Sequence, residues 1–155
     1  MTSGATIDRS IERSLVPYAI HVDRVRGRLT VIGTDPIGLP DVLALLSRQI
    51  ESGAWGFGSL HDARLVTWQP TPADILTIVG FIDSNAETLG PRGPVAFLAH
   101  GEAVVGMAQM YAQVAEASAL RAEVFRDVQA AEEWLDLAVS KDKQRRAAAN
   151  RRLDA

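Results

Sequence analysis

The chain has 155 residues and no cysteine, with 47% apolar and 23% charged residues and a formal net charge of −3. This length suits one hydrophobic core, and no apolar run approaches the ~18 residues that cross a bilayer. The absence of cysteine excludes disulfides, thiolate metal ligands and a cysteine nucleophile. Together with a polar start that lacks the apolar stretch of a secretory signal, it predicts a cytoplasmic protein.

Charge is unevenly distributed along the chain. Residues 141–155 carry six Lys or Arg against two Asp, a net of +4, which leaves −7 on residues 1–140. A protein that binds nucleic acid carries its positive charge over one face of the folded domain. We therefore expect no nucleic-acid partner. We expect a flexible arm over 1–15, one domain over 16–140 and a basic tail over 141–155. That tail either extends the last helix or is disordered.

Strand and helix patterns alternate along the domain. Tyr18, Ile20 and Val22 alternate with polar residues, as in a strand, whereas Val42, Leu45, Leu46 and Ile50 have helical spacing before Gly53. The expected strands cover 18–23, 28–33, 60–66, 93–100 and 121–125, and the expected helices cover 41–52, 73–90, 102–118 and 127–139. This β-β-α-β-α-β-α-β-α order predicts an α/β domain, with a mixed, mostly parallel sheet of about five strands and about four helices.

The join between the third strand and the second helix reads VTWQPTPAD. Thr71, Pro72 and Asp74 have the residue types and spacing of a capped helix start. Thr67 and Thr71 also supply hydroxyls at a position where small regulatory proteins carry a phosphorylated residue. We therefore consider both threonines as phosphosites, with the helix cap as the simpler interpretation of Thr71.

Residues 18–137 resemble the SpoIIAA-like family, small bacterial proteins grouped with STAS domains and CRAL-TRIO lipid-transfer domains. The similarity rests on GPVAFLAHGEAVVGMAQMYAQVAEASALRAEVFRDVQAAEEWL and on DAR at 62–64. It implies a SpoIIAA-like, STAS-like single domain. Anti-sigma-factor antagonists of the wider group carry a phosphorylatable serine in a DSSG-type turn, which VTWQPTPAD lacks. The resemblance therefore implies the fold but not the partner-switching activity.

Residues that commonly carry out catalysis do not form a recognisable constellation. Ser59, His61 and Asp62 are the types of a nucleophilic triad, but we expect strand alternation to place His61 on the face opposite Ser59. His21, His61 and His100 lack the spacing of a metal site, and the SGAWGFGS loop follows a helix rather than opening one, unlike a phosphate-binding loop. We therefore predict no enzyme activity, no metal and no cofactor.

Several large apolar side chains lie where a core does not obviously need them. The candidates for contact with a ligand or a partner are Trp55, Phe57, Trp68, Leu76 and Phe81. The helix over 73–90 is apolar on more than one face. Asp62 and Arg64, two residues apart on a strand, either pair with each other or line a polar mouth.

Two functions are consistent with these features. The first is a non-enzymatic regulatory or protein-interaction module, with a homodimer or another protein as partner. The second is a small apolar-ligand or lipid binder, associated peripherally with a membrane through the basic tail.

Overall fold

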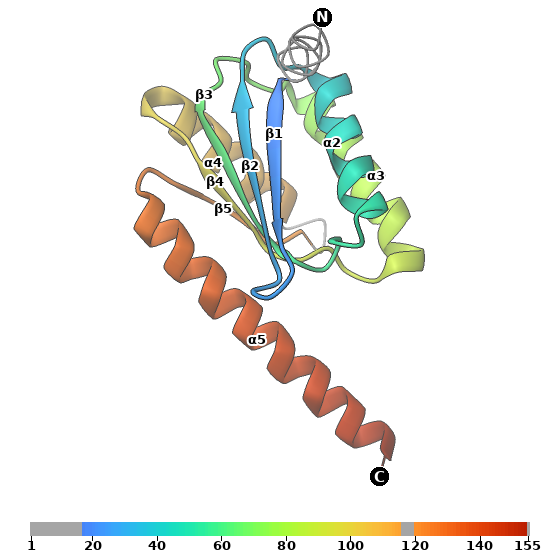
Figure 1. Ribbon diagram of the computed structural model, residues 1–155. Helices are drawn as coiled ribbons and strands as arrows, with labels where there is room; N and C mark the ends of the chain where they lie inside the picture. Colours follow the sequence, from blue (N-terminus) through green and yellow to red (C-terminus); the bar gives the residue numbers. More distant parts are fainter. Residues whose placement is uncertain (1–16, 116–119, 155) are drawn as a thin grey trace, which may run out of the picture.

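The computed structural model describes residues 17–115 and 120–154 and shows a five-stranded sheet with four helices (Figure 1). The elements are β1 (Tyr18–Asp23), β2 (Arg28–Thr34), α2 (Leu39–Glu51), β3 (Gly58–Leu65), α3 (Pro72–Leu89), β4 (Val95–Leu98), α4 (Gly101–Ala115), β5 (Ala122–Phe125) and α5 (Val128–Asp154). The predicted element order is confirmed.

The strands follow the order β1-β2-β3-β4-β5 across the sheet. β1 and β2 form a hairpin and pair antiparallel, and the remaining neighbours are parallel, as the predicted mixed, mostly parallel sheet requires. The register sets Val31 beside His61 and His61 beside Phe97. These three side chains therefore share one face of the sheet at its centre.

Helices cover the two faces unequally (Figure 1). α5 packs on one face, where Leu60 and Leu98 form a cluster with Ala131 and Leu135. α2, α3 and α4 lie against the other face. A sheet covered on both sides explains why β4 is a continuous apolar run.

Local signals explain most of the observed boundaries. Thr71 Oγ1 accepts a hydrogen bond from Asp74 N at 3.1 Å, and Asp74 Oδ2 accepts one from Thr71 N at 2.9 Å, so the predicted cap is confirmed. β4 is shorter than the predicted 93–100. Pro94 has no N–H to donate to a neighbouring strand, and Gly101 has a φ of +58° at the start of α4.

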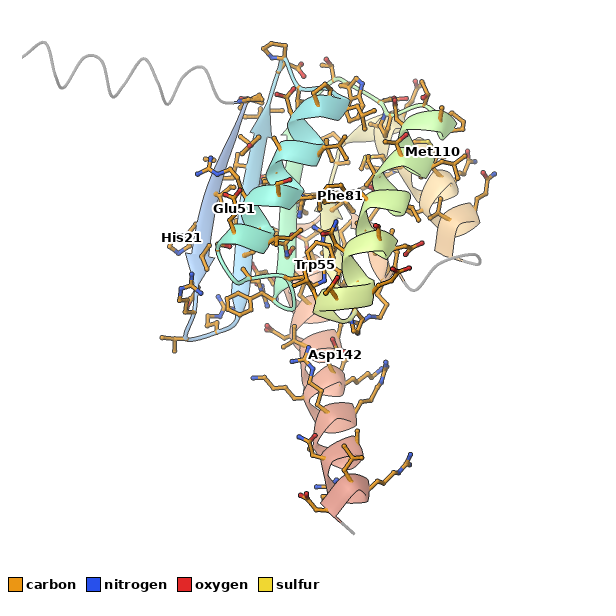
Figure 2. All side chains as sticks on the ribbon, turned by 90° about the vertical axis from the view of Figure 1, so that its right-hand side faces the viewer. His21, Glu51, Trp55, Phe81, Met110 and Asp142 are labelled. Carbon is orange, nitrogen blue, oxygen red and sulfur yellow. The ribbon has the colours of Figure 1, made fainter. Side chains whose placement is uncertain are left out.

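The last helix includes the basic tail, the first of the two expected alternatives. α5 continues to Asp154, so the basic tail is helical over 141–154. Figure 2 shows this end of α5 projecting away from the sheet beyond Asp142, which pairs with Arg121. The predicted arm over 1–15 lies outside the described residues, as does Ala155.

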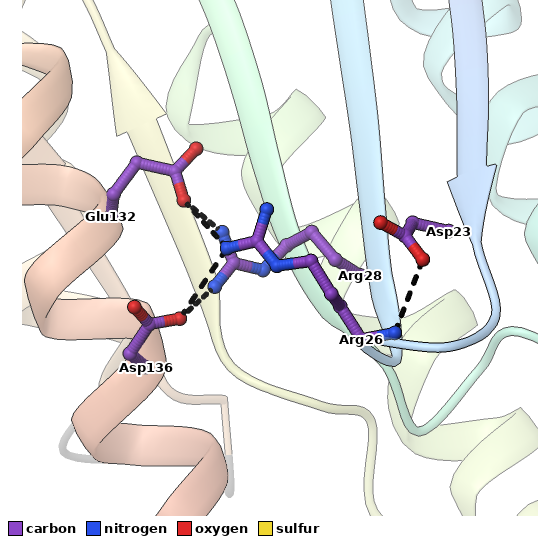
Figure 3. A network of polar contacts seen from close by, with 5 residues as sticks. All are labelled: Asp23, Arg26, Arg28, Glu132 and Asp136. Carbon is purple, nitrogen blue, oxygen red and sulfur yellow. Dashed lines mark hydrogen bonds and ion pairs between the residues drawn. The ribbon is translucent and has the colours of Figure 1, made fainter.

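A network of charges holds α5 against the β1–β2 hairpin (Figure 3). Arg28 is only 5% exposed and donates to Glu132 and to Asp136 of α5. Arg26 lies 3.6 Å from Glu132 and 3.8 Å from Asp136, and its backbone N–H donates to Asp23 at 3.1 Å. Two arginines of the hairpin thus face the two carboxylates of α5, and within the described residues the Asp23 side chain accepts only from the Arg26 backbone.

Candidate functional site

A cavity of about 120 Å³ lies between the sheet and helices α2, α3 and α4. Its wall is mainly apolar. The larger apolar members include Val31, Leu45, Ile75, Ile78, Val79, Ile82, Phe97, Met107 and Trp68. Voids much larger than a water molecule are few in protein interiors, so this one is a feature of the fold that needs an explanation.

The sequence of α3 and the small residues opposite it explain the cavity. Ile75, Ile78 and Val79 line it, which accounts for much of the apolar excess of this helix. Gly33 and Ala103 line it too. The small side chain of Ala103 leaves space that its larger neighbours do not fill. At Gly33, by contrast, Val66 packs closely, and a Cβ there would lie 3.0 Å from Val66 Cγ2.

Arg92 is a buried charged residue in the cavity wall. It lies between α3 and β4, is 7% exposed and lines the cavity. Its Nε and Nη2 donate to Gln49 Oε1 at 3.3 and 3.0 Å, and its guanidinium lies 5.9 Å from the centre of the Trp55 ring. Burial lowers the pKa of Arg92 to about 10, so it stays protonated at neutral pH.

Gln49 is held in place by its own hydrogen bonds. Its Nε2 donates to Ala54 O at 3.0 Å and to Ser59 Oγ at 3.4 Å. Its Oε1 is therefore directed at Arg92. An amide oxygen carries only a partial charge, and no carboxylate in residues 17–115 and 120–154 lies within ion-pair distance of Arg92.

His61 and Tyr111 line the same cavity on either side of Phe97. The Phe97 ring lies 5.2 Å from the His61 ring and is stacked with Tyr111 at 4.8 Å. Within the described residues, the buried His61 Nε2 has no hydrogen-bond partner. Burial, followed by the charge of Arg92, lowers the pKa of His61 to about 3, and burial raises that of Tyr111 to about 12. Both rings are neutral at pH 7.

The five apolar candidates do not gather at one place. Trp68 lines the cavity, whereas Trp55 and Phe81 pack in the core between α2 and α3 (Figure 2). Trp55 Nε1 donates to the Gly90 carbonyl at 2.9 Å. Phe57 lines a second, more polar hollow near α5, and Leu76 is 69% exposed.

The polar candidates have local partners. Arg64 Nη2 donates to Asp62 Oδ2 at 2.7 Å, and this side-chain hydrogen bond lowers the pKa of Asp62. Asp62 also lies at the edge of the cavity. Thr67 Oγ1 donates to Asp35 at 2.7 Å, and Thr71 caps α3, so both hydroxyls take part in structural hydrogen bonds.

The expected separation of Ser59 from His61 was wrong. Residues two apart on a strand point to the same face, and both side chains lie on the side covered by α2, α3 and α4. The structure bonds Ser59 to Gln49, whereas His61 lines the cavity. His21 is exposed on β1, and nowhere in the described part of the chain do three potential metal ligands lie together.

Sequence reasoning missed Arg92, Gln49 and Tyr111. The available signal was GPRGP at 90–94, a single charge between two Gly-Pro pairs directly before a buried strand. The chain directly before a buried strand lies next to the core. A charged side chain there is buried unless it points to solvent. His61 was considered only as part of a triad or a metal site.

Comparison with solved structures identifies the fold. A crystal structure of an uncharacterised protein of family DUF3478 from Shewanella loihica PV-4, described as having a SpoIIAA-like fold, aligns with a TM-score of 0.51. The two chains are 17% identical over 76% of this chain and 93% of that one. No family model matches the sequence, and no curated protein matches it. The chain thus has the predicted SpoIIAA-like fold.

Among the described helices, none combines the length and apolar character required to cross a membrane.

Proposed function

We propose that this protein is a non-enzymatic binding module that takes up a small apolar molecule between the sheet and helices α2, α3 and α4. The observation that supports the proposal is the cavity of about 120 Å³ with a mainly apolar wall. Engineered cavities of about 150 Å³ lined by Leu, Ile and Phe stay dry and bind benzene. An apolar ligand that enters a native cavity of similar size and lining gains free energy in the same way, because its surface is removed from water.

The volume restricts the size of the ligand. A cavity near that of the benzene-binding example accommodates a single aromatic ring or a short branched chain. A long-chain lipid would need much more space. We therefore favour a small apolar molecule over a membrane lipid.

The ionisable groups at the cavity support binding rather than catalysis. A general acid or base works best with a pKa near the operating pH. The pKa of His61 is about 3 and that of Tyr111 about 12, so neither group is suited to exchange protons at neutral pH. Arg92 contributes charge and hydrogen-bond donors.

Filling the cavity is expected to abolish ligand binding. Toluene at five times its dissociation constant should stabilise the wild type by about 1 kcal/mol. Ala103→Leu should lose this stabilisation, because Ala103 lines the cavity. Ala108→Leu is the matched control, since Ala108 lies on the exposed side of the same helix. Thermal unfolding with and without toluene provides the measurement. An equal response of both variants, or no response of the wild type, would contradict the proposal.

A regulatory, protein-interaction role is the second candidate, and it rests on α3. Leu76 is 69% exposed on this helix, and Ala73 and Gly80 are exposed at helical spacing on either side of it. Contiguous exposed apolar surface marks interaction sites. In this case we expect a homodimer that Leu76→Gln weakens at least tenfold. Light scattering over a range of protein concentrations tests this, and a wild type that is monomeric throughout would exclude the homodimer.

A further inference from the structure

We propose that the molecule bound in this cavity is a small apolar monocarboxylate, with its carboxylate on Arg92 and its hydrocarbon part among the apolar side chains. This inference rests on the proposed binding function and names the chemical class of the ligand.

The charge of Arg92 has no counter-charge among the described residues. A buried cation is costly unless a counter-charge and hydrogen bonds accompany it. Arg92 is buried and has Gln49 Oε1 as a neutral acceptor, and the described residues supply no carboxylate at ion-pair distance. By contrast, the similarly buried Arg28 has Glu132 and Asp136. The two sites differ in that Arg92 also borders a cavity.

The guanidinium of Arg92 has N–H donors to spare. Arg92 Nε and Nη2 both donate to the single Gln49 Oε1, at 3.3 and 3.0 Å. A guanidinium has five N–H donors, so three remain, and guanidinium groups form strong hydrogen bonds with carboxylates. Arg92 lines the cavity, so a ligand carboxylate on the remaining donors would add the negative charge that the Gln49 amide lacks.

The other polar groups at the cavity add no net charge. His61 and Tyr111 line the same cavity as Arg92, and the buried Nε2 of His61 has no partner among the described residues. A neutral imidazole and a phenol each offer a hydrogen bond without adding charge. Asp62 also lines the cavity, but it is paired with Arg64. The net charge of +1 from Arg92 matches a monoanion and disfavours a phosphate dianion.

The test compares acids with neutral molecules of the same shape. Benzoate is paired with nitrobenzene, and isovalerate with isovaleramide, and their dissociation constants are measured at pH 7 by ligand-observed NMR. For the wild type we expect the acid of at least one pair to bind about tenfold or more tightly than its neutral partner, as for hydrogen bonds to charged groups.

Two variants test whether Arg92 causes the preference for the acid over its neutral partner. Arg92→Met removes the charge, and Gln49→Glu places a carboxylate from the protein next to Arg92. In both variants the acid should lose its advantage, with a ratio near one or below, whereas the neutral molecule still binds. Circular dichroism checks that each variant is folded.

The outcomes separate the two proposals. Equal binding of acid and neutral partner by the wild type would overturn the carboxylate assignment and leave the apolar cavity supported. A wild-type preference for the acid that persists in a folded Arg92→Met protein would also overturn it. Binding of neither acid nor neutral molecule would contradict both proposals.

Discussion

Replacement of Gly93 by alanine is expected to destabilise the protein by about 3 kcal/mol or more, as severe overpacking of a core does. A Cβ at Gly93 would lie 2.2 Å from the Phe57 carbonyl oxygen and 2.6 Å from that of Gly56. Both are backbone atoms, so no rotation of a side chain relieves the clash. Gly93 N also donates to Trp55 O at 3.0 Å, which holds the two segments together.

Gly80→Ala is the matched control for this substitution. Gly80 is an exposed residue within α3, and a Cβ there meets nothing within 4 Å. Because alanine favours the helix over glycine, this variant should gain about 0.5–1 kcal/mol. Urea unfolding of both variants measures the difference. Similar stabilities of the two variants would show that the loop at 56–57 does not press against Gly93.

Acidification from pH 7 to pH 5 is expected to remove about 2 kcal/mol of stability through His61 alone. The folded-state pKa of His61 is about 3, below the ordinary value of 6.5, chiefly because of burial. Between pH 3 and pH 6.5, His61 is therefore protonated in the unfolded chain but neutral in the folded protein. The contribution of the neutral imidazole is complete above pH 6.5 and falls as the pH drops toward 3.

The comparison of His61→Leu with the wild type isolates this effect. Other titrating groups are common to both proteins, so the stability difference between them should shift by about 2 kcal/mol in favour of the variant between pH 7 and pH 5. His21→Leu serves as the control for replacing a histidine of the same sheet, because His21 is exposed on β1. Urea unfolding at several pH values measures both. A constant difference for His61→Leu would mean that the pKa of His61 is the same in the folded protein as in the unfolded chain.

The fold was predictable because it depends on local patterns. The period-2 pattern of Tyr18, Ile20 and Val22 and the 3.6-residue spacing in 41–52 are properties of neighbouring residues. The capping box at Thr71 and the cap at Asp127, whose carboxylate accepts from Ala130 N at 3.0 Å, are also local. Such signals need no knowledge of distant segments. The alternation of strands and helices then indicated the layered α/β architecture.

The candidate site was largely unpredictable, because it depends on contacts between residues far apart in the chain. Arg92 is buried because Gln49, 43 residues earlier, accepts its hydrogen bonds. His61 meets Phe97 through the register of β3 and β4. The periodicity of α3 could not show that Ile75 is buried and that Leu76, the next residue, is exposed. It therefore could not indicate which of the two contacts a ligand. Local preferences in the sequence thus determined the helices and strands. Only the tertiary packing decided which side chains surround a cavity, because a cavity forms where elements far apart in the chain leave space between their side chains.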